Sequence, residues 1–553
     1  MTDIREQRER VLAPFVTSPD AKIYALRHEV PPEVFGAFGS YFSRNPKDLR
    51  EHLLDALDGR IQGQEVSADW GWLAQGGWRS PSSALGAGLR KSQDFFREVY
   101  GGYSHKSIAN MVWIPFVAND VSQLFARELA RDQLAFFIEQ STRYVKFDVT
   151  SVTQDPDIGK EGLGDVFDHA VAALVNTYES TLDAAVRRYR DELPFDRWKE
   201  LQGEEVLRKS EKKQKALYSN QIRGKGLDVA RFLLPQCIRT NIAWILDARS
   251  SEFDIALWKG HPLSEMRAAA QLFEEAAGEV APSLLKYTER NEYYAKFQSG
   301  SDLQDLVLMS EPVPFRKSAR VLSVDQDALD RVLVAVLRTC ARGGSYGQRL
   351  SDVQALTFPE KIEVLRKVTE DRGKHDEWVT PGKELDGVRI AVEICTDVGA
   401  VRDWRRHQAW DRSESLYTLE NGVEKPQPLI DLGSEISDSF DRAMQIALDA
   451  ERRIRAKLAH QAQYVVPMAA RHSWVASSGL DQLQYLLWTR STPHANFSYR
   501  QDAFNLAEAA VRTLPWLLGY QEYPASKPFL EVYRDAPLKG VLRLQVGEEA
   551  LHT

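Results

Sequence analysis

Two short stretches of this sequence gather side chains that suit the binding of phosphates and planar rings. In the first, Arg131-Asp132-Gln133 is followed by the run Glu139-Gln140-Ser141-Thr142-Arg143-Tyr144. Guanidinium groups bind phosphate through paired hydrogen bonds, and hydroxyl and amide groups match phosphate oxygens and pyrimidine edges. This density of donors favours a nucleotide monophosphate site. Arg131 alone has a plainer interpretation, because a cation near a helix C-terminus complements the helix dipole.

The second stretch is richer in nitrogen. Arg405, Arg406, His407 and Gln408 are consecutive, and the run Ser413-Glu414-Ser415-Leu416-Tyr417 follows. A single histidine at a helix end is more often a cation that satisfies the dipole. Two arginines beside it favour a pyrophosphate or a flavin ring as the ligand.

The elements that position these stretches occur twice in the same order. An alternating apolar run over 111–117 predicts a strand that leads into a helix capped by Asp120, with Gln123 reaching back to the cap. Alternation over 388–394 predicts a second strand, followed by a helix that begins at Thr396. Further along, each copy has an apolar run that ends in proline, at 230–235 and 462–467. A diverged tandem duplication explains this order.

The repeats define the expected domains. The first occupies about residues 22–295 and the second about 320–540, joined by a connector over 297–318 that is marked by Gly, Ser and Pro. Apolar spacing of three and four predicts helices at 165–190, 263–277, 437–460 and 501–514. Helices outnumber strands, so we expect an α+β fold of two tandem modules, each an antiparallel sheet with long helices. The first copy has a charged helical insertion over 183–225, interpreted as a solvated excursion with a partner-binding basic arm as the alternative.

Composition narrows the functional classes. The net charge of −8 argues against a dedicated nucleic-acid surface. No apolar run is long enough for a membrane span, and the charged N-terminus lacks the features of a secretory signal. The cysteines Cys237, Cys340 and Cys395 are widely spaced, which predicts a reduced cytoplasmic setting, buried packing thiols and neither zinc nor disulfides. We expect no metal.

Five elements in order resemble the flavin-dependent thymidylate synthases. Arg131-Asp132-Gln133, seven residues, then Ser141-Thr142-Arg143-Tyr144 is similar to that family's Arg-His-Arg motif and Glu-x-Ser-x-Arg-Tyr frame. Ser104-His105-Lys106-Ser107 resembles its Gly-His-x-Ser turn, 230–235 its Ala-Arg-x-x-Leu-Pro element, and Asp247-Ala248-Arg249-Ser250 its Asn-Ala-Arg-Ser element. The second copy resembles the family through Arg406-His407-Gln408, Val466-Pro467 and the segment 493–500.

The resemblance implies FAD as cofactor, methylenetetrahydrofolate and NADPH as co-substrates, and one-carbon transfer to C5 of a uracil nucleotide such as dUMP. It implies catalytic roles for Ser141 and Arg249. Reduced flavin carries the redox chemistry in that family, so no cysteine nucleophile is needed. By the resemblance, the remaining contacts divide between substrate and cofactor. The substrate set is Gln140, Ser141, Arg143, Arg231 and Arg249, and the cofactor set is His105, Ser107, Arg131, Glu139, Arg406, His407 and Gln408.

The chain departs from the family pattern at several positions. Asp132 stands where the family has histidine, and Gln133 and Gln408 each replace an arginine. Because the copies lost different groups, we expect a homodimer that acts as a pseudo-tetramer and pools residues of both copies in shared pockets. The alternative is a non-catalytic or repurposed scaffold that binds nucleotide or flavin.

Overall fold

The computed structural model describes residues 12–13, 15–27, 46–57, 60–61, 64–65, 106–147, 150–300, 310–340, 343–369, 385, 387–491 and 495–517. The chain divides into two compact units. Unit 1 comprises Met1–Asn176, Leu234–Glu311 and Gln445–Val465, and unit 2 comprises Thr177–Leu233, Pro312–Met444 and Val466–Thr553. Each unit is therefore built around one sequence repeat but also contains a segment of the other repeat. The boundaries predicted from the motifs describe the repeats, and the compact units cut across them.

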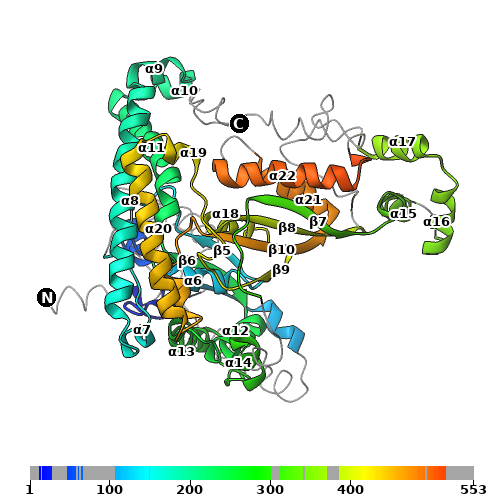
Figure 1. The fold of residues 1–553 in the computed structure, drawn as a ribbon. Helices are drawn as coiled ribbons and strands as arrows, with labels where there is room; N and C mark the ends of the chain where they lie inside the picture. Colours follow the sequence, from blue (N-terminus) through cyan, green and yellow to red (C-terminus); the bar gives the residue numbers. More distant parts are fainter. Residues whose placement is uncertain are drawn as a thin grey trace. The chain divides into compact units, whose positions relative to one another are not determined.

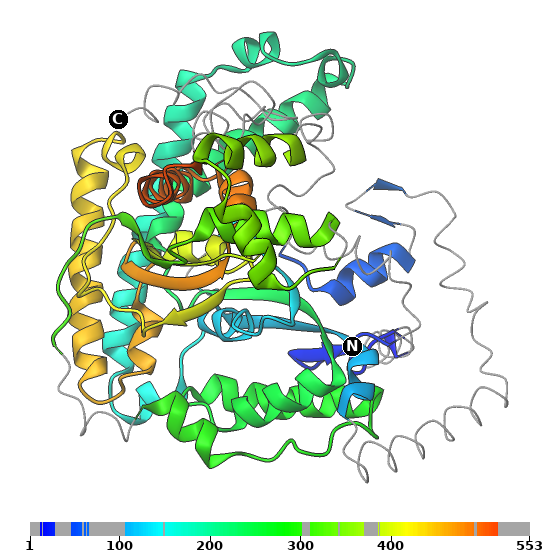
Figure 2. The same ribbon diagram turned by 90° about the vertical axis from the view of Figure 1, so that its right-hand side faces the viewer.

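The sheet of unit 1 is antiparallel, with the order β1-β4-β6-β5. Its strands are β1 (Ile23–Ala25), β4 (Trp113–Ser122), β5 (Phe136–Glu139) and β6 (Arg239–Asp247). The helices α12 (Ala248–Lys259) and α13 (Ser264–Val280) cover one face of this sheet (Figure 2). The rings of Phe116, Trp244 and Phe273 pack together beneath α13, with centroid separations of 4.7–5.7 Å. Short helices complete the unit: α3 (Leu49–Leu57), η3 (Lys106–Met111), α6 (Gln123–Leu129), α7 (Pro156–Lys160), α14 (Glu292–Ser299) and η7 (Gln461–Val465).

The sheet of unit 2 repeats this topology, in the order β7-β8-β10-β9. Its strands are β7 (Ser318–Val324), β8 (Arg389–Asp397), β9 (Asp411–Glu414) and β10 (Arg471–Gly479). The helix α22 (Phe497–Thr513) lies along β7 and β8 (Figure 1). The other helices of unit 2 are α9 (Phe195–Glu200), α10 (Glu204–Leu207), α11 (Glu211–Ala230), η4 (Arg231–Leu233), α15 (Ala328–Cys340), α16 (Tyr346–Gln354), α17 (Phe358–Thr369), α18 (Val398–Trp404), α19 (Gln427–Ile430) and α21 (Leu480–Arg490).

The chain passes from one unit to the other at five points, and two of these points lie within long helices. These are α8 (Gly164–Glu192) and α20 (Ser434–Arg455). As a result, η4 of the first repeat belongs to unit 2, and η7 of the second repeat belongs to unit 1. The predicted α+β fold of two tandem modules, each with an antiparallel sheet, is confirmed, as are the four predicted helices.

The predicted helix starts need correction. In the first repeat Ser122, and not Asp120, caps α6 by accepting a hydrogen bond from the amide of Phe125 at 3.0 Å. Asp120 lies in a β-bulge of β4 with a φ of 53°, so the chain reaches the helix two residues later than the pattern indicates. In the second repeat Asp397 caps α18 through the amide of Ala400 at 2.8 Å, one residue after the predicted Thr396.

The remaining predictions have mixed outcomes. The charged insertion is helical, and its apolar residues form a small cluster of their own: Leu193, Trp198, Tyr218 and Ile222. Cys237 is buried, but Cys340 is exposed and Cys395 is partly exposed, so the prediction of buried thiols is wrong for Cys340. Among the helices that the structure describes, none combines the length and hydropathy needed to span a bilayer.

Candidate ligand sites in the two units

Unit 2 concentrates four guanidinium groups around one buried carboxylate. Arg231 of η4 lies with its Nη1 3.6 Å from Oδ2 of Asp403, on α18. Arg406 approaches the other side of the same carboxylate, with Nε 3.8 Å from Oδ1. The charges of Arg490 and Arg402 also act on Asp403. We call these four arginines and Asp403 the arginine cluster.

Positive side chains dominate the electrostatics of this cluster. Burial tends to raise the pKa of the Asp403 carboxyl, but the surrounding arginines, Arg406 and Arg231 foremost, hold it at about 2. Asp403 is therefore ionised at neutral pH. Four guanidinium groups gather around this one carboxylate, and such a concentration of cations favours an anionic ligand.

Arg231 is the most deeply buried member, with 2% of its surface exposed. Its Nη2 donates to the carbonyl of Gly399 at 3.2 Å, whereas its Nε has no hydrogen-bond partner among the residues described. The following residue, Phe232, stacks on Phe497 with 5.8 Å between ring centroids and accepts a hydrogen bond from the amide of Ala469 at 2.8 Å. These contacts fix η4 within unit 2. A buried guanidinium with an unused N–H can donate a hydrogen bond to a further acceptor, such as a phosphate oxygen.

His407 adjoins the cluster as a neutral ring. Its Nε2 accepts a hydrogen bond from Nε of Arg490 at 2.9 Å, and its ring meets that of Tyr485 edge-on at 5.8 Å. Burial and the charge of Arg490 lower the pKa of His407 to about 3. Because Nε2 is the acceptor, the ring proton resides on Nδ1. The plainer interpretation of His407 as a cation satisfying the helix dipole is therefore wrong.

Arg405 has a structural role. Its Nε lies 3.0 and 3.1 Å from the two carboxylate oxygens of Glu414, and its Nη2 bonds both Glu414 and the Tyr417 hydroxyl. All three side chains are buried, and the pKa of Arg405 is raised by Glu414 and Tyr417 in opposition to its burial. The run that follows the second motif thus holds β9 against the end of α18.

Unit 1 contains the counterpart of this arrangement. Glu128 stands three residues before Arg131, as Asp403 stands three residues before Arg406. Its Oε2 lies 2.8 Å from Nη1 of Arg131 and 3.6 Å from Nε2 of His261. Burial opposes ionisation of Glu128, but His261 and the arginines hold its pKa well below the ordinary value. At the place of η4, unit 1 has η7, where the amide oxygen of Gln463 bonds Nη1 of Arg127 at 2.5 Å. Unit 1 therefore has a neutral amide where unit 2 has the buried Arg231.

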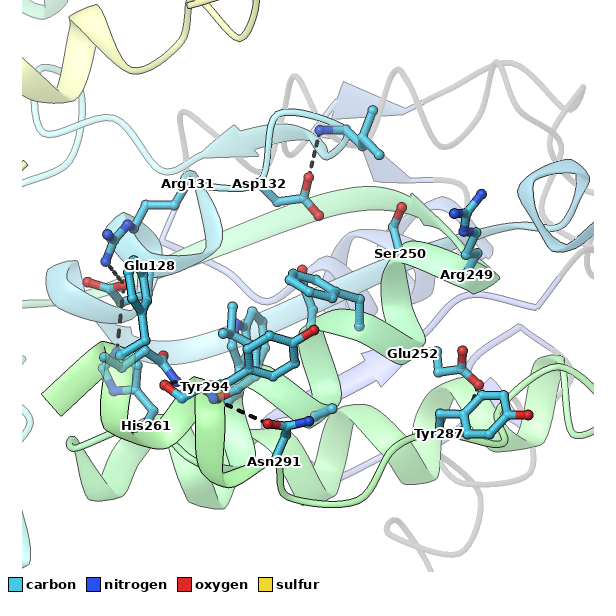
Figure 3. A pocket seen from close by; sticks show the side chains of 18 of the residues that line it. Glu128, Arg131, Asp132, Arg249, Ser250, Glu252, His261, Tyr287, Asn291 and Tyr294 are labelled. Carbon is cyan, nitrogen blue, oxygen red and sulfur yellow. Dashed lines mark hydrogen bonds and ion pairs between the residues drawn. The ribbon is translucent and has the colours of Figure 1, made fainter. Parts of the chain in front are cut away.

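A cavity of about 980 Å³ opens beside Glu128 in unit 1. Figure 3 shows Glu128, Arg131 and His261 at one end of it, and Arg249, Glu252 and Tyr287 at the other. The lining is rich in aromatic and acidic side chains: Phe253, Trp258, Tyr287, Tyr293, Tyr294 and Phe297, with Glu128, Asp132, Glu252, Asp254 and Glu289. Its basic residues are Lys106, Arg131 and Arg249, so acids outnumber them.

Asp132 and Asp254 form a carboxyl pair in the wall of this cavity. Burial and the neighbouring Asp132, which is hydrogen-bonded to it, raise the pKa of Asp254 well above its ordinary value, and Asp247 adds to the effect. Burial also raises the pKa of Asp132, although its carboxylate accepts a hydrogen bond from the amide of Leu134 at 2.6 Å. Two carboxyl groups in hydrogen-bond contact retain a proton between them. This pair lies where the family pattern has a histidine, and it disfavours a phosphate.

The other predicted site residues are dispersed within unit 1. Gln140 is buried, and its amide donates to the carbonyl of Asn241 at 2.9 Å. Ser141 is partly exposed just after β5, and its hydroxyl oxygen accepts from the amide of Arg143 at 3.2 Å. Glu139 is the last residue of β5 and is half-buried. None of these four residues is among those lining the cavity described above.

Arg249 is exposed near the start of α12, where Asp247 caps the helix by accepting from the amides of Arg249 and Ser250. Ser107 is exposed in η3, and His105 lies outside the described residues. Gln408 directly follows His407 in the sequence. It is partly exposed, but its side-chain nitrogen is buried. The structure thus brings Arg231, Arg406 and His407 together in unit 2, and places Ser141, Arg143 and Arg249 in unit 1.

Sequence reasoning missed Asp403, Glu128 and Arg490. Alignment of the two repeats on their Arg-x-Gln motifs would have found the first two, because both acids precede the motif arginine by the same interval. Arg490 ends α21 far along the chain, and no local pattern distinguishes it from a surface cation.

The chain is similar to proteins of known families. A family model described as "Thymidylate synthase complementing protein" matches residues 68–283 and again 322–516. A UPF0159 protein of Chlamydia muridarum is 27% identical over 95% of this chain and 94% of its own length. A UPF0159 protein of Thermoplasma acidophilum is 26% identical, over 82% of this chain and 94% of its own.

Two further similarities cover only part of the chain. A flavin-dependent thymidylate synthase of Clostridium tetani is 24% identical over 35% of this chain and 69% of its own length. A solved UMP/dUMP methylase from Streptomyces cacaoi is 14% identical over 39% of this chain and all of its own, with a TM-score of 0.28. At that TM-score the structural likeness carries no argument.

Proposed function

Since the chain belongs to the thymidylate synthase complementing protein family, with a match in each repeat, we propose that it transfers a one-carbon group to C5 of a uracil nucleotide in a flavin-dependent reaction. The observation that carries this proposal is the arginine cluster. There Arg231 and Arg406 both lie within ion-pair distance of Asp403. The resemblance assigns Arg231 to the substrate and Arg406 to the cofactor. Groups expected to hold two ligands of one reaction thus adjoin in one unit, although they come from different repeats.

The cluster fits an anionic ligand of the kind that dUMP and FAD both present. Its gathered guanidinium groups and the unused Nε of Arg231 suit phosphate oxygens, which accept charge-assisted hydrogen bonds. When bound, FAD would supply the redox chemistry of the transfer. The thiol of Cys237 is a poor nucleophile, since burial raises its pKa. The protein therefore contributes binding, orientation and charge.

Each residue of the cluster has a definable task in this proposal. Arg231 binds and orients the nucleotide phosphate, because its backbone is fixed by the Phe232 contacts and its guanidinium cannot leave the site. His407 remains neutral at physiological pH and offers its Nδ1–H as a hydrogen-bond donor. Asp403 holds Arg231 and Arg406 close together as their common carboxylate partner. Ser141, Arg143 and Arg249, all in unit 1, remain nucleotide contacts that the resemblance predicts.

The proposal is tested by turnover of dUMP labelled with tritium at C5, supplied with FAD, methylenetetrahydrofolate and NADPH. The full chain should take up FAD, become yellow and release tritium to water. Arg231→Lys keeps the charge but loses the planar fork, and should reduce dUMP affinity by roughly 10- to 100-fold, the equivalent of about 1.5–3 kcal/mol for a hydrogen bond to a charged group. A colourless protein that releases no tritium favours the alternative of a non-catalytic scaffold.

A further inference from the structure

The cavity of unit 1 differs in charge from the arginine cluster of unit 2, although both occupy equivalent places after the Arg-x-Gln motifs. The cavity is lined by five acidic and three basic side chains, whereas the cluster has four arginines and one aspartate. At the position equivalent to the buried Arg231, unit 1 has the neutral Gln463. The amide oxygen of Gln463 accepts a hydrogen bond from Arg127. The two units therefore present opposite electrostatic preferences to a ligand.

The wall of the cavity has an unused hydrogen-bond acceptor in addition to the carboxyl pair. Asp254 is 5% exposed, and Asp132 is its hydrogen-bonded neighbour. Asn110 also lines the cavity, and its buried Oδ1 has no hydrogen-bond partner within the described part of the chain. A buried acceptor without a donor is costly, so a ligand that supplies N–H groups would be favoured here.

Aromatic side chains form a second surface of the same cavity. Tyr293 stacks on Phe297 with 6.4 Å between centroids, and Tyr294 meets Phe253 edge-on at 5.3 Å. Yet Tyr293, Phe297 and Phe253 keep 70%, 71% and 48% of their surfaces exposed. Aromatic faces attract cations and stack on planar rings, and these faces are left uncovered by the described protein.

We propose that the cavity of unit 1 is a binding site for a flat organic cation of the amidinium type, with adjacent N–H donors on an aromatic ring. The amidinium N–H groups donate to the carboxylates of Asp132 and Asp254, and to Oδ1 of Asn110. The ring packs against the aromatic wall. Unit 1 thereby takes a cationic ligand while unit 2 takes an anionic one, and this assignment does not depend on the reaction proposed above.

A proton accompanies this binding. The carboxyl pair holds one proton when the site is empty, and the charge of Asp247, the cap of α12, also raises the pKa of Asp254. An amidinium carries its own N–H donors, so it replaces the shared proton, which is released to solvent. Both carboxylates are then ionised and paired with the ligand.

The test uses benzamidine and its neutral isostere benzamide, titrated calorimetrically into the full chain in two buffers of different ionisation enthalpy. Benzamidine should bind at least tenfold more tightly than benzamide and release a proton. Asp254→Asn should weaken benzamidine binding by at least tenfold. It should also abolish proton release. The matched control is Glu289→Gln, which removes an exposed acid of the same cavity and should change affinity by less than threefold.

Three outcomes contradict the proposal. They are equal affinity for the two probes, unchanged benzamidine binding in Asp254→Asn, and an equal loss in Glu289→Gln, which would indicate only a general negative potential. Circular dichroism of each variant shows whether it is folded. If Asp254→Asn is unfolded, Asp132→Asn serves instead, with the same predictions. Loss of dUMP turnover in Arg231→Lys leaves these results unaffected, so the two proposals fail separately.

Discussion

Replacing Asp403 with asparagine should both destabilise the protein and strengthen its attraction for anions. The four arginines lower the pKa of the Asp403 carboxyl from 3.8 to about 2, which corresponds to about 2 kcal/mol of favourable interaction with the charged form. Breaking a buried ion pair from one side costs about 3–5 kcal/mol, because the remaining charge is left uncompensated. We therefore expect the free energy of unfolding at pH 7 to fall by about 2–5 kcal/mol.

Urea denaturation followed by tryptophan fluorescence measures this loss. The carboxyl pKa is depressed in the folded state, so its contribution is complete above the unfolded value of 3.8 and is lost as pH falls toward about 2. The difference between the wild type and Asp403→Asn should accordingly narrow over that range. Asp196→Asn is the control, since the ion pair of Asp196 with Lys199 is at the exposed surface and its removal should have no measurable effect.

The same substitution should strengthen the binding of anions while it weakens the fold. With Asp403 neutral, the cluster loses one negative charge, so pyrophosphate should raise the thermal midpoint of the variant by more than that of the wild type. A variant that is as stable as the wild type at pH 7 would refute the ion-pair reasoning. A variant whose midpoint responds less to pyrophosphate would refute the assignment of the cluster as an anion site.

Two further predictions concern stability. Ser122→Ala should lower the free energy of unfolding by about 1–2 kcal/mol, because it removes the α6 cap together with the hydrogen bond from the Ser122 hydroxyl to Glu265. Asp120→Gly, at the position predicted from sequence, keeps the φ of 53° accessible and should not remove a cap; equal losses in thermal unfolding would contradict this. Burial raises the pKa of Asp502 to about 6, so the folded state favours its protonated form, and the stability that Asp502 contributes below pH 3.8 is lost as pH rises through about 6. Asp502→Asn should therefore flatten the stability profile between pH 4 and 7, and an unchanged profile would count against the shift.

The strands and long helices could be predicted because their hydrophobic periodicities are local. The alternation over 388–394 lies within β8, and the predicted helix at 165–190 lies within α8. The helix starts could not be predicted as well, because the bulge at Asp120 delays α6 and leaves Ser122 to cap it. A bulge depends on pairing with β6, which a local pattern does not contain.

The grouping of the site residues could be predicted from the sequence even less well than the helix starts. No local signal tells which sheet a segment such as η4 will join, so the sequence placed Arg231 beside Ser141 and Arg249 of its own repeat. Within unit 2, Arg231 bonds the carbonyl of Gly399, on α18 of the second repeat. Likewise Arg405 and Arg406 look alike in sequence, yet Glu414 and Tyr417 bury the first while the second remains 44% exposed.

The most direct test of the central claim is calorimetric titration of dUMP into the FAD-loaded full chain and its Arg231→Lys variant, beside Arg402→Lys as a second member of the same cluster. If the arginine cluster of unit 2 holds the nucleotide phosphate, affinity should fall by roughly 10- to 100-fold in Arg231→Lys and also decline in Arg402→Lys. An unchanged dUMP isotherm in Arg231→Lys would place the nucleotide elsewhere and contradict the account.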